Sequence, residues 1–114
     1  MSVPQHAQGV ALKKLEEAWH RLSERPYPRK SSDPGVAALY DELRQVDEEM
    51  AGRLRALIAG QPVNSADFEP PADFLHRLHD AGNAPSSAST EALTYIDYVR
   101  DLYQILRLAR LIAR

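Results

Sequence analysis

Apolar residues recur at steps of three and four in four separate stretches of the chain, a spacing typical of amphipathic helices. The first apolar stripe consists of Leu12, Leu15, Trp19 and Leu22. It predicts a helix over about 7–24. Pro26 ends this helix, because proline disfavours the helical conformation in the residue that precedes it.

The second stretch carries the clearest start signal in the chain. Asp33 is suited to cap the free backbone N–H groups, and Pro34 fits the first helical position. The apolar stripe that follows consists of Leu39, Leu43, Val46, Met50, Leu54 and Leu57. It predicts a helix over about 34–59, with Gly60 as the stop. Gly52 lies inside this helix at a cost of about 1 kcal/mol relative to alanine, so either a neighbour approaches its backbone closely or the helix tolerates the loss.

Two more helices complete the pattern. Pro71 and Gly82 bracket a short helix over about 71–81, and the last stripe predicts a helix over about 90–113. No strand-like alternation extends beyond a few residues. We therefore predict an all-α protein, a small bundle of three long helices and one short helix that forms a single domain over residues 1–114. The connecting loops fall at about 25–33, 60–70 and 82–89.

The last helix is apolar over well more than half of its circumference. Its main stripe, called the seam below, consists of Tyr95, Tyr98, Val99, Leu102, Ile105, Leu106, Ala109 and Ile112. A helix at the edge of a bundle needs an apolar stripe of only about 100°. The excess indicates burial on two sides, either at the centre of the bundle or against another chain. Tyrosines suit an interface, because they join a large apolar body to a hydroxyl that tolerates water. We favour a homodimer or larger homo-oligomer built through this helix.

Two groups of basic residues stand out. Those flanking the seam are Arg100, Arg107, Arg110 and Arg114. The stretch "RPYPRK" adds Arg25, Tyr27, Arg29 and Lys30 in the first loop. We expect the arginines of the last helix to pair mainly with the acidic residues of the second helix, Asp41, Glu42, Asp47, Glu48 and Glu49. Both basic groups are also candidates for binding a partner, either an acidic protein surface or phosphate groups, with Tyr27 able to stack on a base.

The composition narrows the classes of function. A hydrophobic fraction of 44% and a charged fraction of 26% are those of an ordinary globular protein. The chain has no cysteine, which excludes disulfides, thiol catalysis and cysteine–zinc sites. It has no apolar run long enough for a membrane span, and its start lacks the features of a secretory signal. A cytoplasmic, bacterial-type protein is therefore the default expectation, and the net charge of −2 favours no polyanionic partner for the chain as a whole.

The candidate chemistry is sparse. Glu17 and His20 have the spacing used in di-iron bundles, but they lie roughly 150° from the apolar stripe of their helix and point to water. The stretch "DFLHRLHD" places Asp73, His76 and Asp80 on one face with His79 beside them, which is a metal-ligand spacing on an exposed helix face. Motifs of nucleophilic, phosphate-binding and zinc-dependent enzymes are missing. We expect no metal site and no cofactor.

These observations favour a non-enzymatic helical protein-interaction module, in the manner of adaptors, inhibitors and small assembly factors. In this hypothesis it self-associates through the last helix and engages a protein partner of unknown identity. The alternative is a nucleic-acid-associated accessory protein that uses the basic loop and the C-terminal arginines. A metal-dependent hydrolase built on His76 and His79 is a third hypothesis, with the least support from the sequence.

Overall fold

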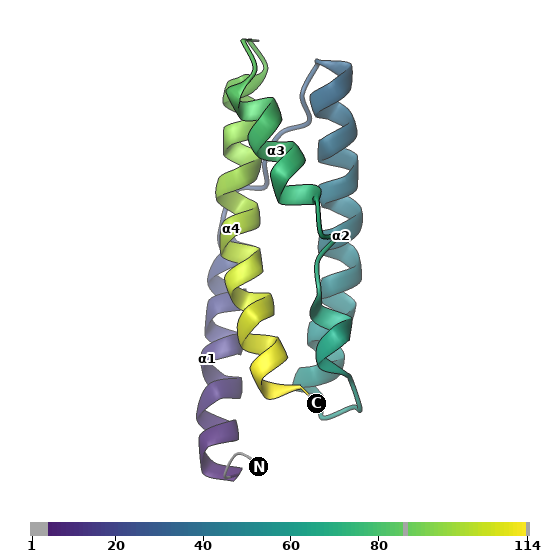
Figure 1. The fold of residues 1–114 in the computed structure, drawn as a ribbon. Coiled ribbons are helices and arrows are strands. Elements are labelled where there is room, and N and C mark those ends of the chain that lie inside the picture. Colours follow the sequence, from purple (N-terminus) through teal and green to yellow (C-terminus); the bar gives the residue numbers. More distant parts are fainter. Residues whose placement is uncertain (1–4, 86, 114) are drawn as a thin grey trace.

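The computed structural model describes residues 5–85 and 87–113, with side chains from residue 9 onwards, and forms a small all-α bundle (Figure 1). Its elements are α1 (Gln5–Glu24), α2 (Pro34–Ile58), the 3-10 helix η1 (Ser65–Phe68), α3 (Phe74–Asn83) and α4 (Ser89–Ile112). The predicted fold class is confirmed. Successive α-helices run in alternating directions along a molecule of 50 × 26 × 19 Å.

The ends of α2 follow the signals in the sequence. The carboxylate of Asp33 accepts a hydrogen bond of 3.0 Å from the N–H of Val36, and Pro34 is the first helical residue. Gly60 takes a positive φ of 79° just after the helix, a conformation that strains any residue with a side chain. Nothing lies within 4 Å of a Cβ built on Gly52, so the helix tolerates this glycine without a close neighbour.

The segment between α2 and α4 differs most from the expectation. The predicted loop over 60–70 contains η1, where the side chain of Asp67 accepts a hydrogen bond of 3.0 Å from the N–H of Asn64. The short helix begins at Phe74 instead of Pro71, whose carbonyl accepts a 3.3 Å bond from the N–H of Phe74. Two apolar anchors, Phe68 and Phe74, are fully buried. They fasten the segment to the bundle, although about half of its residues lie outside helices.

Helix α4 is the centre of the molecule, because it contacts α1, α2, η1 and α3. Helix α1 lies beside its lower half, and the loop 25–33 passes behind its upper half to the start of α2 (Figure 1). The hydroxyl of Tyr95 fixes this loop, since it donates to the carbonyl of Arg29 at 2.6 Å and accepts from the N–H of Ser31 at 2.9 Å. Ser31 is buried, and its hydroxyl donates to Glu91 at 3.0 Å.

The core takes side chains from every element. The largest of those with almost no exposed surface are Leu15, Leu43, Met50, Leu54, Phe68, Phe74, Leu78, Tyr95, Val99, Leu102 and Leu106. Each side chain of this size contributes roughly 1.5–3 kcal/mol by leaving water. Four of them belong to α4, which is why the other elements pack around this helix.

Candidate functional site

A groove of about 920 Å³ lies between α1 and α2, and two smaller hollows elsewhere measure about 400 and 370 Å³. Its lining consists of Glu16, Glu17, Trp19, His20, Leu22, Ser23, Arg25, Tyr27, Asp47, Ala51, Ile58 and Tyr98. We call it the α1/α2 groove. Its size is in the range of ligand-binding sites, and half-buried apolar side chains such as Trp19 and Ile58 form much of its surface.

The groove exists because α1 and α2 both pack on α4 but barely touch each other. Tyr98 of α4 lies at the base of the gap between them. Tyr103, five residues further along α4, lies about 140° away around the helix, on the side where Glu42 and Arg77 influence its hydroxyl. Segment 65–83 therefore covers one side of α4, whereas no described helix covers the gap between α1 and α2.

A polar cluster lies at the base of the groove. The hydroxyl of Tyr98 donates a 2.9 Å hydrogen bond to the carboxylate of Asp47. Burial raises the pKa of Asp47 above its usual value of 3.8, although the hydrogen bond from Tyr98 opposes the shift. The ring of Tyr27 lies 5.1 Å from the ring of Tyr98, and burial together with the charge of Asp47 raises the pKa of both tyrosines.

The charged groups along the groove differ in how they are paired. Arg25 forms an ion pair with Asp101 of α4, and His20 lies 2.8 Å from the carboxylate of Glu24. Glu17 and His20 are exposed, as the sequence predicts, and so is Glu16. Neither glutamate has an ion-pair partner among the described residues. The carboxylates of the groove therefore carry most of its uncompensated charge.

The predicted seam lies in the core of the chain itself. Seven of its eight residues are buried, and Ile112 is half-buried against the same core. Central burial was the first of the two alternatives that the sequence left open, and it accounts for the wide apolar surface of α4. Self-association stays a prediction that a single chain does not test, and a second copy would need apolar surface outside the seam.

The arginines of α4 are spread apart. Arg100 and Arg107 are exposed, whereas Arg110 is half-buried and donates a 3.0 Å hydrogen bond to the carbonyl of Phe68. Arg114 lies outside the described residues. None of the three described arginines forms an ion pair with α2, so that expectation is wrong for them.

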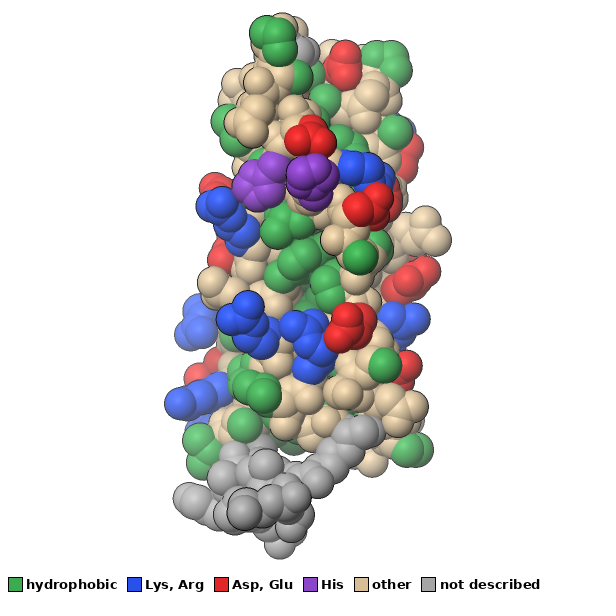
Figure 2. Space-filling view, in the orientation of Figure 1, with side chains coloured by type: hydrophobic (Ala, Val, Ile, Leu, Met, Phe, Trp, Pro, Cys, Tyr) green, Lys and Arg blue, Asp and Glu red, His purple; other side chains and the backbone are tan. Residues whose placement is uncertain are grey.

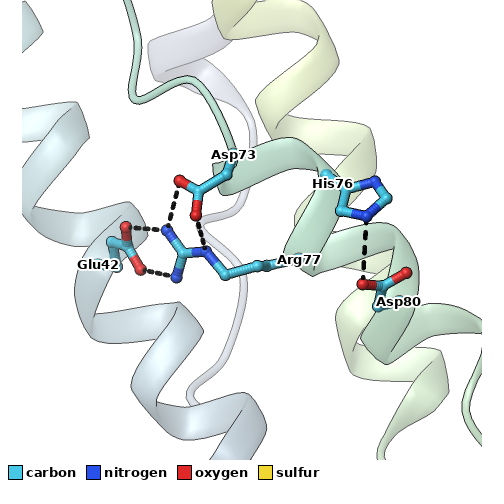
Figure 3. A network of polar contacts seen from close by, with 5 residues as sticks. All are labelled: Glu42, Asp73, His76, Arg77 and Asp80. Atoms are coloured by element: carbon cyan, nitrogen blue, oxygen red, sulfur yellow. Dashed lines mark hydrogen bonds and ion pairs between the residues drawn. The ribbon is translucent and has the colours of Figure 1, made fainter.

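The acidic residues of α2 take partners from elsewhere. Lys30 pairs with Asp41 at 3.0 Å. Arg77 of α3 reaches Glu42 through two bonds of 2.6 Å and also binds Asp73 (Figure 3). Lys30 of loop 25–33 and Arg77 of α3 thus reach the first half of α2, which is a tertiary arrangement that sequence spacing does not contain.

The side chains that were predicted to share one face of α3 take part in two separate interactions. Asp73 binds Arg77, which lowers the pKa of Asp73, whereas His76 faces Asp80 at 3.5 Å (Figure 3). Histidine side chains lie beside acidic and basic ones at the level of α3 on this side of the molecule (Figure 2). The described residues bring together no group of three or more histidine, aspartate or glutamate side chains able to hold a metal ion.

The groove between α1 and α2 was not predicted from the sequence. Sequence reasoning assigned Trp19 to the core stripe and Asp47 to the charged face of α2, but the two residues line one hollow. A partial signal was present, because Asp47 adjoins the stripe residues Val46 and Met50. An acid at that border is half withdrawn from water as soon as a tyrosine packs beside it.

Comparison of the chain with protein-family models, with curated proteins and with solved structures gave no match. Among the described helices, none combines the length and apolar character needed to cross a membrane.

Proposed function

We propose that this chain is a non-enzymatic protein-interaction module that receives a basic amphipathic helix of a partner protein in the α1/α2 groove. The observation that carries the proposal is the groove itself, an apolar hollow of about 920 Å³ along two helices that α4 holds apart. Such a hollow suits the helix-in-groove mode of recognition, in which apolar side chains at every third or fourth position of a partner helix enter it.

The dimensions of the groove agree with this mode. Asp47 and Ile58 mark its extent along α2, and they are eleven residues apart. At about 1.5 Å per residue this span is about 16 Å, which is the length of about three turns of a docked helix. A helix of that length presents two or three apolar residues on one face. The groove residues that would contact them are Trp19, Ala51 and Ile58.

The charge of the groove favours a basic partner over nucleic acid. Carboxylates on both walls repel phosphate groups. In the basic loop, Arg25 and Lys30 are already paired with Asp101 and Asp41. The alternative of nucleic-acid binding therefore depends on the remaining exposed cations, and it predicts retardation of DNA or RNA at low salt that vanishes as salt rises.

The groove contains the only tryptophan of the chain, Trp19, which provides a direct signal. A displayed library of helical peptides, randomised on one face, would be selected against the protein, and the selected peptides would be synthesised and titrated. We expect a blue shift of the tryptophan emission and saturable binding. The substitution Ala51→Phe should abolish both, because it fills the groove from α2.

Ala38→Phe is the matched control, because Ala38 is exposed on the same helix and lies outside the groove. This variant should bind like the unchanged protein. Selected peptides that bind Ala51→Phe with unchanged affinity would contradict the proposal. A blue shift that follows protein concentration without any peptide would also overturn it, because it would assign the groove to a second copy of the chain.

A further inference from the structure

One acidic residue of the groove differs from the others. Glu16 and Glu17 extend into water, whereas Asp47 is partly withdrawn from it at the base. No described lysine or arginine lies within ion-pair distance of its carboxylate. Among the described side chains, its hydrogen-bond donor is the hydroxyl of Tyr98. A carboxylate in this position loses hydration, and a single neutral donor does not replace the water it has lost.

The surroundings of Asp47 suit a cation. Tyr27 and Tyr98 lie beside it, with their rings 5.1 Å apart, and Trp19 lines the same groove. Aromatic faces attract ammonium and guanidinium groups. The chain already uses one ring in this way, because the guanidinium of Arg44 lies 5.1 Å from the centre of the Tyr27 ring. The hydroxyl of Tyr27 is also buried without a hydrogen-bond partner among the described side chains.

We propose that Asp47 is the anchor of the groove and receives one lysine or arginine side chain of the docked helix beside Tyr98 and Trp19. This inference rests on the proposed function and adds the feature that selects the partner. The cation replaces the water that the carboxylate loses, and the apolar side chains of the partner fill the rest of the groove towards Ala51 and Ile58.

The anchor predicts a pattern in the partner sequence. Asp47 lies at one end of the groove, Ala51 one turn along α2 and Ile58 about three turns along. A helix packed along α2 therefore carries a basic residue near one end, followed or preceded by apolar residues at steps of three or four. Further basic residues are expected at its edges, opposite Glu16 and Glu17.

A double-mutant cycle between peptide and protein tests the anchor directly. The peptides selected against the unchanged protein should share a lysine or arginine at one fixed position. Replacing that residue by norleucine should weaken binding to the unchanged protein at least tenfold. The same replacement should leave binding to Asp47→Asn unchanged, because the charge that the cation contacts is already absent. Glu49→Gln is the matched control, an exposed acid of α2 outside the groove, and it should preserve the tenfold preference.

The outcomes separate the two proposals. Peptides that dock and are blocked by Ala51→Phe, but that share no fixed basic residue, would overturn the anchor and leave the groove in place. If the norleucine replacement weakened peptide binding to the unchanged protein and to Asp47→Asn equally, the anchor would also be overturned and the groove would stay in place. If the library yields no peptide that docks in the groove, both proposals fall. Circular dichroism of Asp47→Asn should show an unchanged fold, which excludes unfolding as the cause of a lost preference.

Discussion

The two sides of α4 are built in opposite ways. On one side, segment 65–83 covers the helix with two fully buried phenylalanines and an arginine that binds α2. On the other side, α1 and α2 contact α4 but barely touch each other, and a groove stays open between them. The same central helix thus has one side that the chain covers and one side on which a groove stays open.

The difference comes from what each connection contains. Segment 59–85 carries Phe68, Phe74 and Leu78, each with no exposed surface, so it returns across the bundle and buries them. Loop 25–33 is short and bound to the upper part of α4 through Ser31 and Tyr95. Of this loop, Arg25 and Tyr27 line the gap, beside residues such as Tyr98, and the rest of the gap stays open.

The largest expected change in stability comes from a comparison of one aromatic residue on each side of α4. Phe68→Ala should lower the free energy of unfolding by about 3–5 kcal/mol, because it leaves a cavity under the covered side. Trp19→Ala should lower it by only about 1 kcal/mol, because Trp19 is half-buried in the groove. Urea unfolding followed by circular dichroism measures both, since Trp19→Ala removes the only tryptophan. Equal losses would mean that the groove side contributes to stability as much as the covered side does.

The next prediction compares two glycines whose replacement by alanine should change the free energy of unfolding in opposite directions. Gly60→Ala should destabilise by about 1 kcal/mol, because its φ of 79° turns the chain towards the covering segment and strains a side chain. Gly52→Ala should stabilise by up to about 1 kcal/mol, because nothing lies within 4 Å of its new methyl group. Thermal unfolding of both variants gives the signs. A gain from Gly60→Ala would contradict the turn geometry.

A smaller effect on stability depends on pH and comes from Asp47, on the open side of α4. The pKa of Asp47 is raised in the fold above 3.8, so the folded protein holds that proton more tightly than the unfolded chain. Stability from this group therefore falls as pH rises from 3.8 through the raised pKa, and Asp47→Asn should remove the fall. Above that range the variant should be at least as stable as the unchanged protein. The groups that act on Asp47 are Tyr98, Arg44 and Glu48.

Urea unfolding of both proteins across that pH range measures the difference. A disadvantage of Asp47→Asn that grows with pH would show that the chain itself stabilises the charge of Asp47. It would also remove the reason to expect an external cation there.

The smallest effect concerns the ion pairs of the covered side. Arg77→Lys should destabilise slightly, because an ammonium cannot reproduce the paired 2.6 Å bonds of the guanidinium to Glu42. The pKa of Asp73, which Arg77 lowers, should rise towards its usual value, and an NMR titration of the carboxyl measures it. The stability that Asp73 contributes is lost as pH falls through its lowered pKa. An unchanged pKa in the variant would show that the arginine is not its cause.

Much of the fold was determined locally. Asp33 and Pro34 start α2 through their own backbone chemistry, and Gly60 ends it, so these limits could be predicted from the sequence. The four helical stretches follow from apolar spacing in the same way. The wide apolar surface of α4 also indicated that this helix is buried on more than one side. It did not indicate which elements bury it.

The tertiary structure alone decided which surfaces meet. It placed the seam against α1, α2 and the covering segment, and it paired Glu42 with Arg77 across 35 residues of sequence. It also brought Trp19, Asp47 and Tyr98 from three helices to one groove. Amphipathic spacing records which side of a helix avoids water but not its neighbour, because any apolar surface of suitable shape satisfies it. The groove is therefore a property of how the helices pack, and not of any one helix.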